Sequence, residues 1–146
     1  MKQELISVLE TFGYPVYLQG SMNIDDAYPD SFFTFWNNSS DETAHYDNDA
    51  SAFVWDFDVN FYSSNPALVN TVPVTARKRL KAAGFIVRGK GHDVLSDEIT
   101  HTGRGLDVYY REENTPPDPP GPEPEPSPED DEDENEETDG DTANNR

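Results

Sequence analysis

Two aspartates separated by one residue, Asp56 and Asp58, form the pattern in this sequence that is best suited to chemistry. In an extended strand both carboxylates point to the same side, and such a pair can bind a divalent metal ion for phosphoryl transfer. Further acids upstream, at positions 42, 47 and 49, could join them. A metal-dependent nuclease also needs basic residues to attract its substrate, and none lies nearby in sequence. We therefore favour the alternative, that the pair lies on a solvated sheet face.

Other reactive patterns are incomplete. His45, His92 and His101 are too few and too scattered to predict a zinc site. The segment 84–91 resembles a phosphate-binding loop, but no Ser or Thr follows Lys90, and the expected helix precedes the glycines instead of following them. No nucleophile-elbow pattern is present. We expect no catalytic residue, no cofactor and no metal, and hence a protein that is not an enzyme.

The composition divides the chain in two. The whole chain has 146 residues, with 30 acidic and 10 basic side chains, 12 prolines and no cysteine. Residues 114–146 hold 13 of the acids, 8 of the prolines and a single apolar side chain, so we predict a disordered Pro-rich acidic tail. Residues 1–113 hold all the aromatic residues and form one globular α+β domain. The tail is interpreted as a solvating appendage, with a tether or a DNA-mimicking segment as the alternative.

The same totals exclude several classes of protein. A pI near 4.1 argues against binding of nucleic acid through its phosphates. No apolar run approaches the roughly 18 residues of a membrane span, so no membrane partner is expected. Glu4 and Glu10 interrupt the amino-terminal segment, which does not have the pattern of a secretory signal.

Charge is also uneven within residues 1–113. Residues 3–76 contain 11 acids and no base, whereas residues 77–113 contain 8 bases and 6 acids. Two interpretations stay open: either the halves of the sequence do not correspond to surfaces, or one subunit carries two complementary surfaces that favour head-to-tail association. The segment Thr100–Gly105 is expected to be a loop, in which Arg104 either belongs to a tight turn or pairs with an acidic neighbour.

The elements that must position these residues follow from periodicity and turn signals. We expect a helix ending before Gly13 and a second helix after Asn65 that Pro73 breaks or kinks. Segments 20–30, 38–51 and 89–103 are expected to be loops. The expected strands are Val16–Gln19, Ser31–Asn37, Phe53–Phe61, Phe85–Arg88 and Leu106–Arg111.

The resulting order, α-β-β-β-α-β-β, predicts an α+β fold: a mostly antiparallel sheet of about five strands with two helices on one face. Alternation in the strand Phe53–Phe61 places its large apolar side chains on the covered face and Asp56 and Asp58 on the other. The predicted core comprises Leu9, Phe12, Phe53, Trp55, Phe57, Val59, Phe61, Leu80, Phe85 and Val108.

Five strings in order along residues 5–112 resemble the small tail terminator (tail completion) proteins of long-tailed phages that infect Gram-positive bacteria. The acidic tail lies outside this resemblance. The five strings are Tyr28–Trp36, His45–Asn48, Phe53–Phe61, Ala76–Phe85 and Thr100–Gly105.

The resemblance implies a structural virion protein whose homohexameric ring caps the head-proximal end of the tail tube. The ring would stop polymerisation of the major tail tube protein and join it to the head–tail connector, while DNA passes through without specific binding. Subunits would be made in the host cytoplasm before assembly into the virion.

For the contacts within that ring, we expect the basic residues to face acidic loops of the neighbour and the paired aspartates Asp56 and Asp58 to face the lumen. A head-side stopper or adaptor is the nearest alternative, and a metal-dependent nuclease is a more distant one. The candidate interface residues are Arg77, Lys78, Arg79, Lys81 and Arg104 on the basic side and Asp41, Asp47 and Asp49 on the acidic side.

Overall fold

The computed structural model describes residues 1–46, 49–114 and 121–122. The chain divides into two units, Met1–Thr115 and Pro116–Arg146, and the fold below is that of the first. Most of the predicted tail lies outside the described residues. The elements of the first unit are α1 (Lys2–Glu10), β1 (Val16–Leu18), β2 (Ser31–Tyr46), β3 (Asp49–Ser63), α2 (Pro66–Ala82), β4 (Ile86–Val94) and β5 (Thr102–Glu113).

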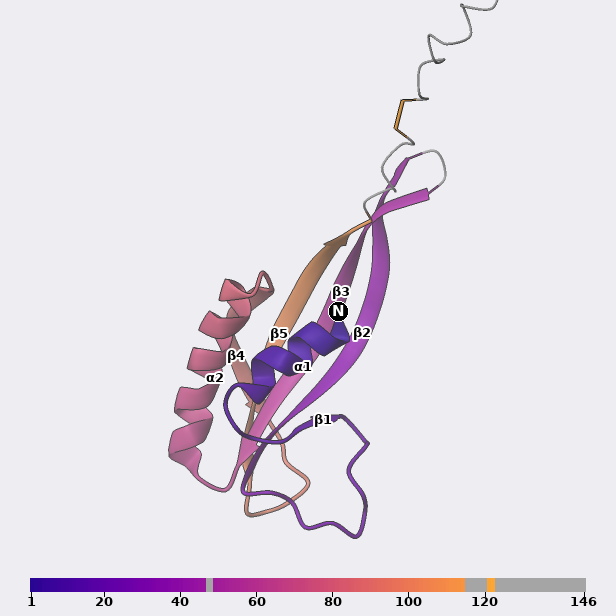
Figure 1. Cartoon of the computed structure of the whole chain (residues 1–146). Coiled ribbons are helices and arrows are strands. Elements are labelled where there is room, and N and C mark those ends of the chain that lie inside the picture. The colour runs from indigo at the N-terminus through magenta and orange to yellow at the C-terminus, as the bar shows by residue number, and fades with distance from the viewer. Residues whose placement is uncertain (47–48, 115–120, 123–146) are drawn as a thin grey trace, which may run out of the picture. The chain divides into compact units, whose positions relative to one another are not determined.

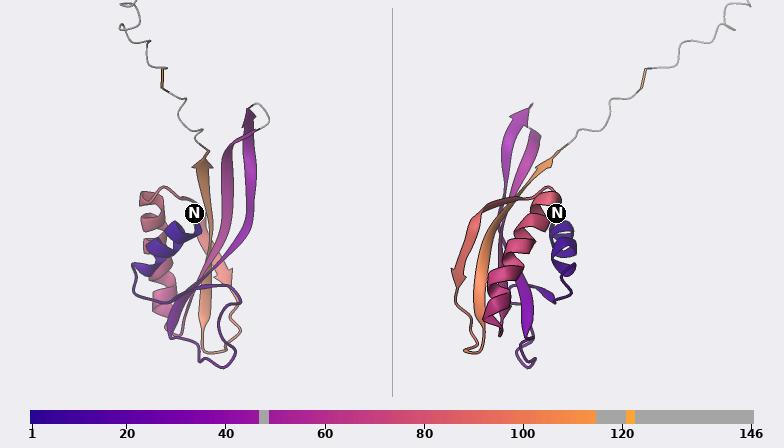
Figure 2. Two further views of the ribbon diagram at one scale, coloured as in Figure 1. Left: turned by 45° about the vertical axis from the view of Figure 1, so that its right-hand side comes forward. Right: turned by 90° about the vertical axis from the view of Figure 1, so that its left-hand side faces the viewer.

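These elements confirm the predicted fold class. The five strands form one sheet in the order β1-β2-β3-β5-β4, and every neighbouring pair is antiparallel except β1 and β2. Both helices lie on one face of this sheet, as Figures 1 and 2 show. The opposite face, which we call the open face, carries no helix.

The core lies between the helices and the central strand β3. Phe57, Val59 and Phe61 alternate along β3 toward the helices and are each at most 1% exposed. Burying each of these side chains contributes about 1.5–3 kcal/mol. Of the other predicted core residues, Leu9, Leu80, Phe85 and Val108 are buried, while Phe12 and Trp55 are partly buried against the cluster.

Helix α2 is continuous from Pro66 to Ala82, so Pro73 does not break it, and the alternative of a kink stays a prediction. Asn65 caps its start by accepting a hydrogen bond from the Ala67 N–H at 3.0 Å, and Pro66 occupies the first turn, where its missing N–H costs nothing. Pro73 is buried in the core-facing stripe beside Val72 and lacks the N–H of a normal helical residue. Packing of this stripe on the sheet holds the helix together across that position.

The predicted loop 38–51 is wrong because the strands continue through it. β2 runs to Tyr46 and β3 starts at Asp49, and together they form a long hairpin that extends past the helices (Figure 2). In β2, residues 41–43 of this hairpin are all exposed, so the apolar alternation that marks a half-buried strand is absent from this part of the sequence.

The same extension corrects the prediction that Phe53 lies at the centre of the core. Phe53 is only partly buried and stands opposite Glu42 and Glu112 instead of beneath a helix. Next along the same side, Trp55 stacks on Phe57 and donates its Nε1–H to the Glu112 carboxylate at 2.7 Å.

The predicted loop 89–103 is also largely strand. β4 continues to Val94, and an irregularity between Arg88 and His92 interrupts its pairing with β5. Gly89 and Gly91 both have positive φ there, which is typical of a β-bulge and explains why the segment resembles a loop in sequence. β5 already starts at Thr102, so the predicted loop Thr100–Gly105 belongs mostly to a strand.

The different burial of two phenylalanines on β3 gives a stability test. Phe57→Ala removes a fully buried ring and should lower the free energy of unfolding by about 3–5 kcal/mol in urea denaturation. Phe53→Ala, four residues along the same side, should cost only about 1–2 kcal/mol because water already reaches that ring. Equal losses for the two variants would contradict this account of the core.

Candidate assembly surfaces

The open face carries the two predicted aspartates. Asp56 and Asp58 alternate with the buried side chains of β3, and both are partly exposed. Asp58 stands opposite Trp36 of β2 on one side and Asp107 of β5 on the other. Trp36 is 48% exposed, so a large aromatic side chain lies beside these carboxylates on the surface.

The open face is electrostatically unfavourable to the subunit itself. Asp58 and Asp107 are directly opposed like charges, an arrangement that destabilises an antiparallel pair. Arg88 of β4 stands opposite Asp107 in the register of the strands. Its guanidinium lies 5.9 Å from the centre of the Tyr109 ring. Asp56 accepts a long hydrogen bond of 3.4 Å from the Asn38 side chain. Around Asp58, the three carboxylates of Asp56, Asp58 and Asp107 outnumber the one guanidinium of Arg88, so this part of the open face has a negative potential.

The described residues do not bring these acids together with others as a metal site. In the part of the chain that the structure describes, no three His, Asp or Glu side chains are grouped so that they could hold a metal ion. None of the described helices combines the length and apolar character needed to cross a membrane.

The four basic candidates on α2 divide into two kinds. The Arg77 Nε–H donates to the Gly89 carbonyl at 2.8 Å, which ties α2 to the bulge of β4. Arg79 donates to the Thr11 hydroxyl at 2.9 Å, and its guanidinium lies 4.0 Å from the centre of the Phe12 ring. Lys78 and Lys81 are exposed. The arginines therefore contact their own subunit, and the lysines face solvent.

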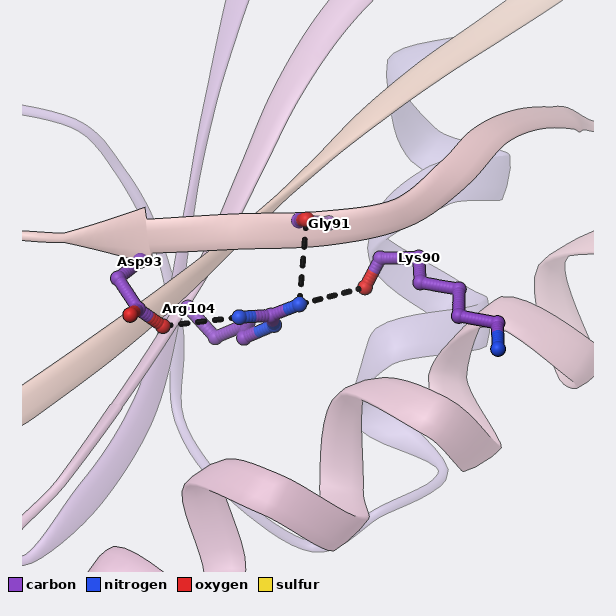
Figure 3. Close-up of polar contacts among 4 residues, drawn as sticks. All are labelled: Lys90, Gly91, Asp93 and Arg104. Carbon is purple, nitrogen blue, oxygen red and sulfur yellow. Dashed lines mark hydrogen bonds and ion pairs between the residues drawn. The ribbon is translucent and has the colours of Figure 1, made fainter.

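Arg104 also contacts its own subunit. Its guanidinium donates to the Asp93 carboxylate at 2.8 Å and to the carbonyls of Lys90 and Gly91 at 3.2 and 3.1 Å. Figure 3 shows the guanidinium lying along β4, between Asp93 and the two carbonyls. Bulge carbonyls have no partner on the adjacent strand, and the planar guanidinium supplies donors to two of them. The predicted pairing of Arg104 with a neighbouring subunit stays a prediction.

Three glycines make this arrangement possible by their lack of a side chain. A Cβ on Gly91 would lie 2.5 Å from the Gly105 carbonyl oxygen, and one on Gly103 would lie 2.7 Å from the Tyr62 ring. A Cβ on Gly105 would lie 2.7 Å from the Asn60 side chain. The glycines around Arg104 therefore let β4, β5 and β3 side chains pack closely within one subunit.

The acidic interface candidates lie on the hairpin. Asp41 is exposed on β2, opposite Val54. Asp49 begins β3, and the structure describes only its backbone, while Asp47 lies outside the described residues. The predicted contact between these acids and the basic residues of a neighbour stays a prediction.

Sequence reasoning missed an aromatic cavity of about 640 Å³ at the end of the sheet away from the hairpin. Phe32 forms its floor, and the rings of Tyr17, Tyr28 and Tyr62 lie 5.3–6.0 Å from the Phe32 ring, centre to centre. His101 shares a hydrogen bond of 2.8 Å with the Pro29 carbonyl and so ties together the two loops beside the cavity. These residues are far apart in sequence. The only signal that could have linked them is that Phe32 and Tyr62 alternate with the buried side chains of their strands.

Two hydroxyl groups lie in this cavity. The Thr34 Oγ1 is buried, in a residue only 8% exposed, and makes no hydrogen bond of good geometry among the described residues. Burial raises the pKa of the Tyr62 phenol above its usual value, and the carboxylate of Asp97 adds to the rise. The Thr34 hydroxyl lies close enough to the phenol to oppose this shift.

Comparison with known proteins adds no family to this description. No protein-family model matches the chain, and no curated protein matches it either.

The bulge in β4 offers a matched pair of substitutions. Gly89 and Gly91 both have positive φ, but only Gly91 lacks space for a Cβ. Gly89→Ala should cost about 1–2 kcal/mol of stability from backbone strain alone. Gly91→Ala should cost more than about 3 kcal/mol, because the new methyl group also displaces the Gly105 carbonyl. Thermal or urea unfolding measures both, and similar costs would show that close packing at Gly91 is unimportant.

Proposed function

We propose that this protein is a structural subunit that forms a closed ring at the head-proximal end of a phage tail tube. The resemblance implies that the ring contains six copies. The resemblance of five strings to tail terminators motivates the proposal. The observation that carries it is the presence of unlike surfaces on one subunit: an acidic open face and hairpin, and a helix α2 whose charged residues are all cations. Unlike surfaces make head-to-tail contacts, which close into rings when the rotation between copies allows it.

The open face suits the wall of a DNA conduit. Asp56, Asp58 and Asp107 place like charges side by side at a cost to the subunit, which points to a role for the charge itself. A wall of carboxylates repels the phosphates of DNA and lets the duplex pass without being gripped.

The sheet also offers edges to a neighbour. β1 covers only Phe33–Phe35 of β2, and β4 is the edge strand at the other side of the sheet. Edge strands pair readily with strands of another chain. Exposed ion pairs contribute only about 0–1 kcal/mol each, so strand pairing and apolar contacts must supply most of the ring's stability.

In the assembled tail, the ring would stop addition of the major tail tube protein and present its other side to the head–tail connector or stopper protein. These partners come from the resemblance. The proposal needs neither a cofactor nor a catalytic residue.

The ring is tested with the full chain, alone and with tail tubes. We expect native mass spectrometry to show a six-fold assembly, and negative-stain images to show a ring at one end of each tube. Adding the protein to polymerising tube subunits should shorten the tubes. A protein that stays monomeric both alone and on tubes would contradict the proposal.

The alternatives give different results in the same preparation. A head-side stopper or adaptor would co-purify with capsids instead of tails. A nuclease would cut DNA in the presence of manganese and lose that activity in Asp56→Ala, whereas the ring proposal expects no cleavage by either form.

A further inference from the structure

The rim of the aromatic cavity combines exposed apolar and acidic side chains. Ile24, Leu95 and Ile99 are almost fully exposed, and the first two line the cavity itself. Exposed large apolar side chains that gather at one place mark a surface that another molecule covers. Asp97 and Glu98 also line the cavity, and they lie with Leu95 and Ile99 in the loop between β4 and β5.

The interior of the cavity is suited to a cation. The rings of Tyr17, Phe32 and Tyr62 line it. Aromatic rings attract ammonium and guanidinium groups. The buried Thr34 hydroxyl makes no hydrogen bond of good geometry among the described residues, although it lies close to the Tyr62 phenol, and its oxygen can accept a bond from an N–H donor. Asp26, Asp97 and Glu98 line the cavity and no lysine or arginine is among its lining residues in the described part of the chain, so its potential is negative.

The same chain carries a surface with the opposite character. Val74, Lys78 and Lys81 are spaced i, i+4 and i+7 on α2 and therefore share one face of the helix. All three are exposed, Val74 to 54%, and neither lysine makes a hydrogen bond or ion pair within the described residues. This α2 stripe presents one apolar side chain followed by two cations.

We propose that the cavity and its rim receive the α2 stripe of a second copy of this chain. Val74 packs against the apolar rim residues, and a lysine of the stripe enters the aromatic cavity between Thr34 and Asp97. This contact rests on the proposed function, because it names the pair of surfaces through which neighbouring ring subunits meet.

The placement of the two surfaces fits a head-to-tail contact. In Figure 1, α2 lies at one side of the unit, and the loop that follows β1 extends toward the other side. Because donor and acceptor surfaces are different and lie apart, each subunit can use both at once, as a ring requires. The two arginines of α2 contact their own subunit, which leaves the lysines as its available cations.

The contact is tested by exchanging the charges. Lys78→Glu/Lys81→Glu and Asp97→Lys/Glu98→Lys should each raise the protein concentration needed for ring assembly by about tenfold or more in sedimentation velocity. Combining all four substitutions in one chain should restore assembly, because every contact then pairs opposite charges again. Lys2→Glu/Arg146→Glu changes the net charge by the same amount as the first variant at two residues that belong to neither surface of the proposed contact, and it should assemble like the unmodified chain.

The outcomes separate this contact from the ring itself. If the unmodified chain forms a ring and Lys78→Glu/Lys81→Glu forms it equally well, the contact is wrong and the proposed function stands. If the fourfold variant is not restored, the charges are not paired across the interface, and the contact is again wrong.

If the unmodified chain forms no ring either alone or on tail tubes, the proposed function fails, and a second measurement still judges the contact. The chain has no cysteine, so Lys81→Cys and Asp97→Cys each introduce a single thiol. Mixing the two variants under mild oxidation should give disulfide-linked dimers well above the level in either variant alone. Dimers at the background level would overturn the contact.

Discussion

The structure depends on the burial of one side of β3. This strand is central in the sheet, pairs along its length with β2 and β5, and buries Phe57, Val59 and Phe61 beneath the two helices. Because side chains alternate strictly along a strand, burying this side forces Asp56 and Asp58 onto the open face. A shift of register by one residue would replace these three buried side chains by Asp56, Asp58 and Asn60, so the position of the acidic surface follows directly from the packing of the core.

This constraint explains which parts of the fold the sequence could predict. Where helices cover the sheet, apolar residues alternate with polar ones, and the strands, their order and the covered face follow from that pattern. Where the helices end, the constraint on side-chain type ends too. The strands of the hairpin beyond Asn37 are paired along their backbones and bury few side chains other than Ala52, and their largely polar composition resembles that of a loop. The second half of β4 also resembles a loop in sequence, because it contains Gly89 and Gly91.

The candidate surfaces were predictable only in part, for a related reason. Asp56 and Asp58 share one strand, so local alternation was enough to place them. The aromatic cavity draws Tyr17, Phe32 and Tyr62 from three strands and Asp97 from a distant loop, and only the tertiary fold brings them together. Likewise, no local pattern distinguishes Arg77 and Arg79, which bind their own subunit, from Lys78 and Lys81 between and beside them.

The difference between those arginines and lysines has a chemical basis. A guanidinium presents several donors in a plane, and it can satisfy carbonyls or hydroxyls of its own subunit while stacking on a ring. Arg77, Arg79 and Arg104 do this at places where α2, the end of α1 and the bulge of β4 meet the rest of the unit. A lysine ammonium is compact, strongly hydrated and carried on a flexible stem, so it stays in solvent at little cost. In the proposed contact the available cations are therefore lysines, because the folded subunit already uses the arginines.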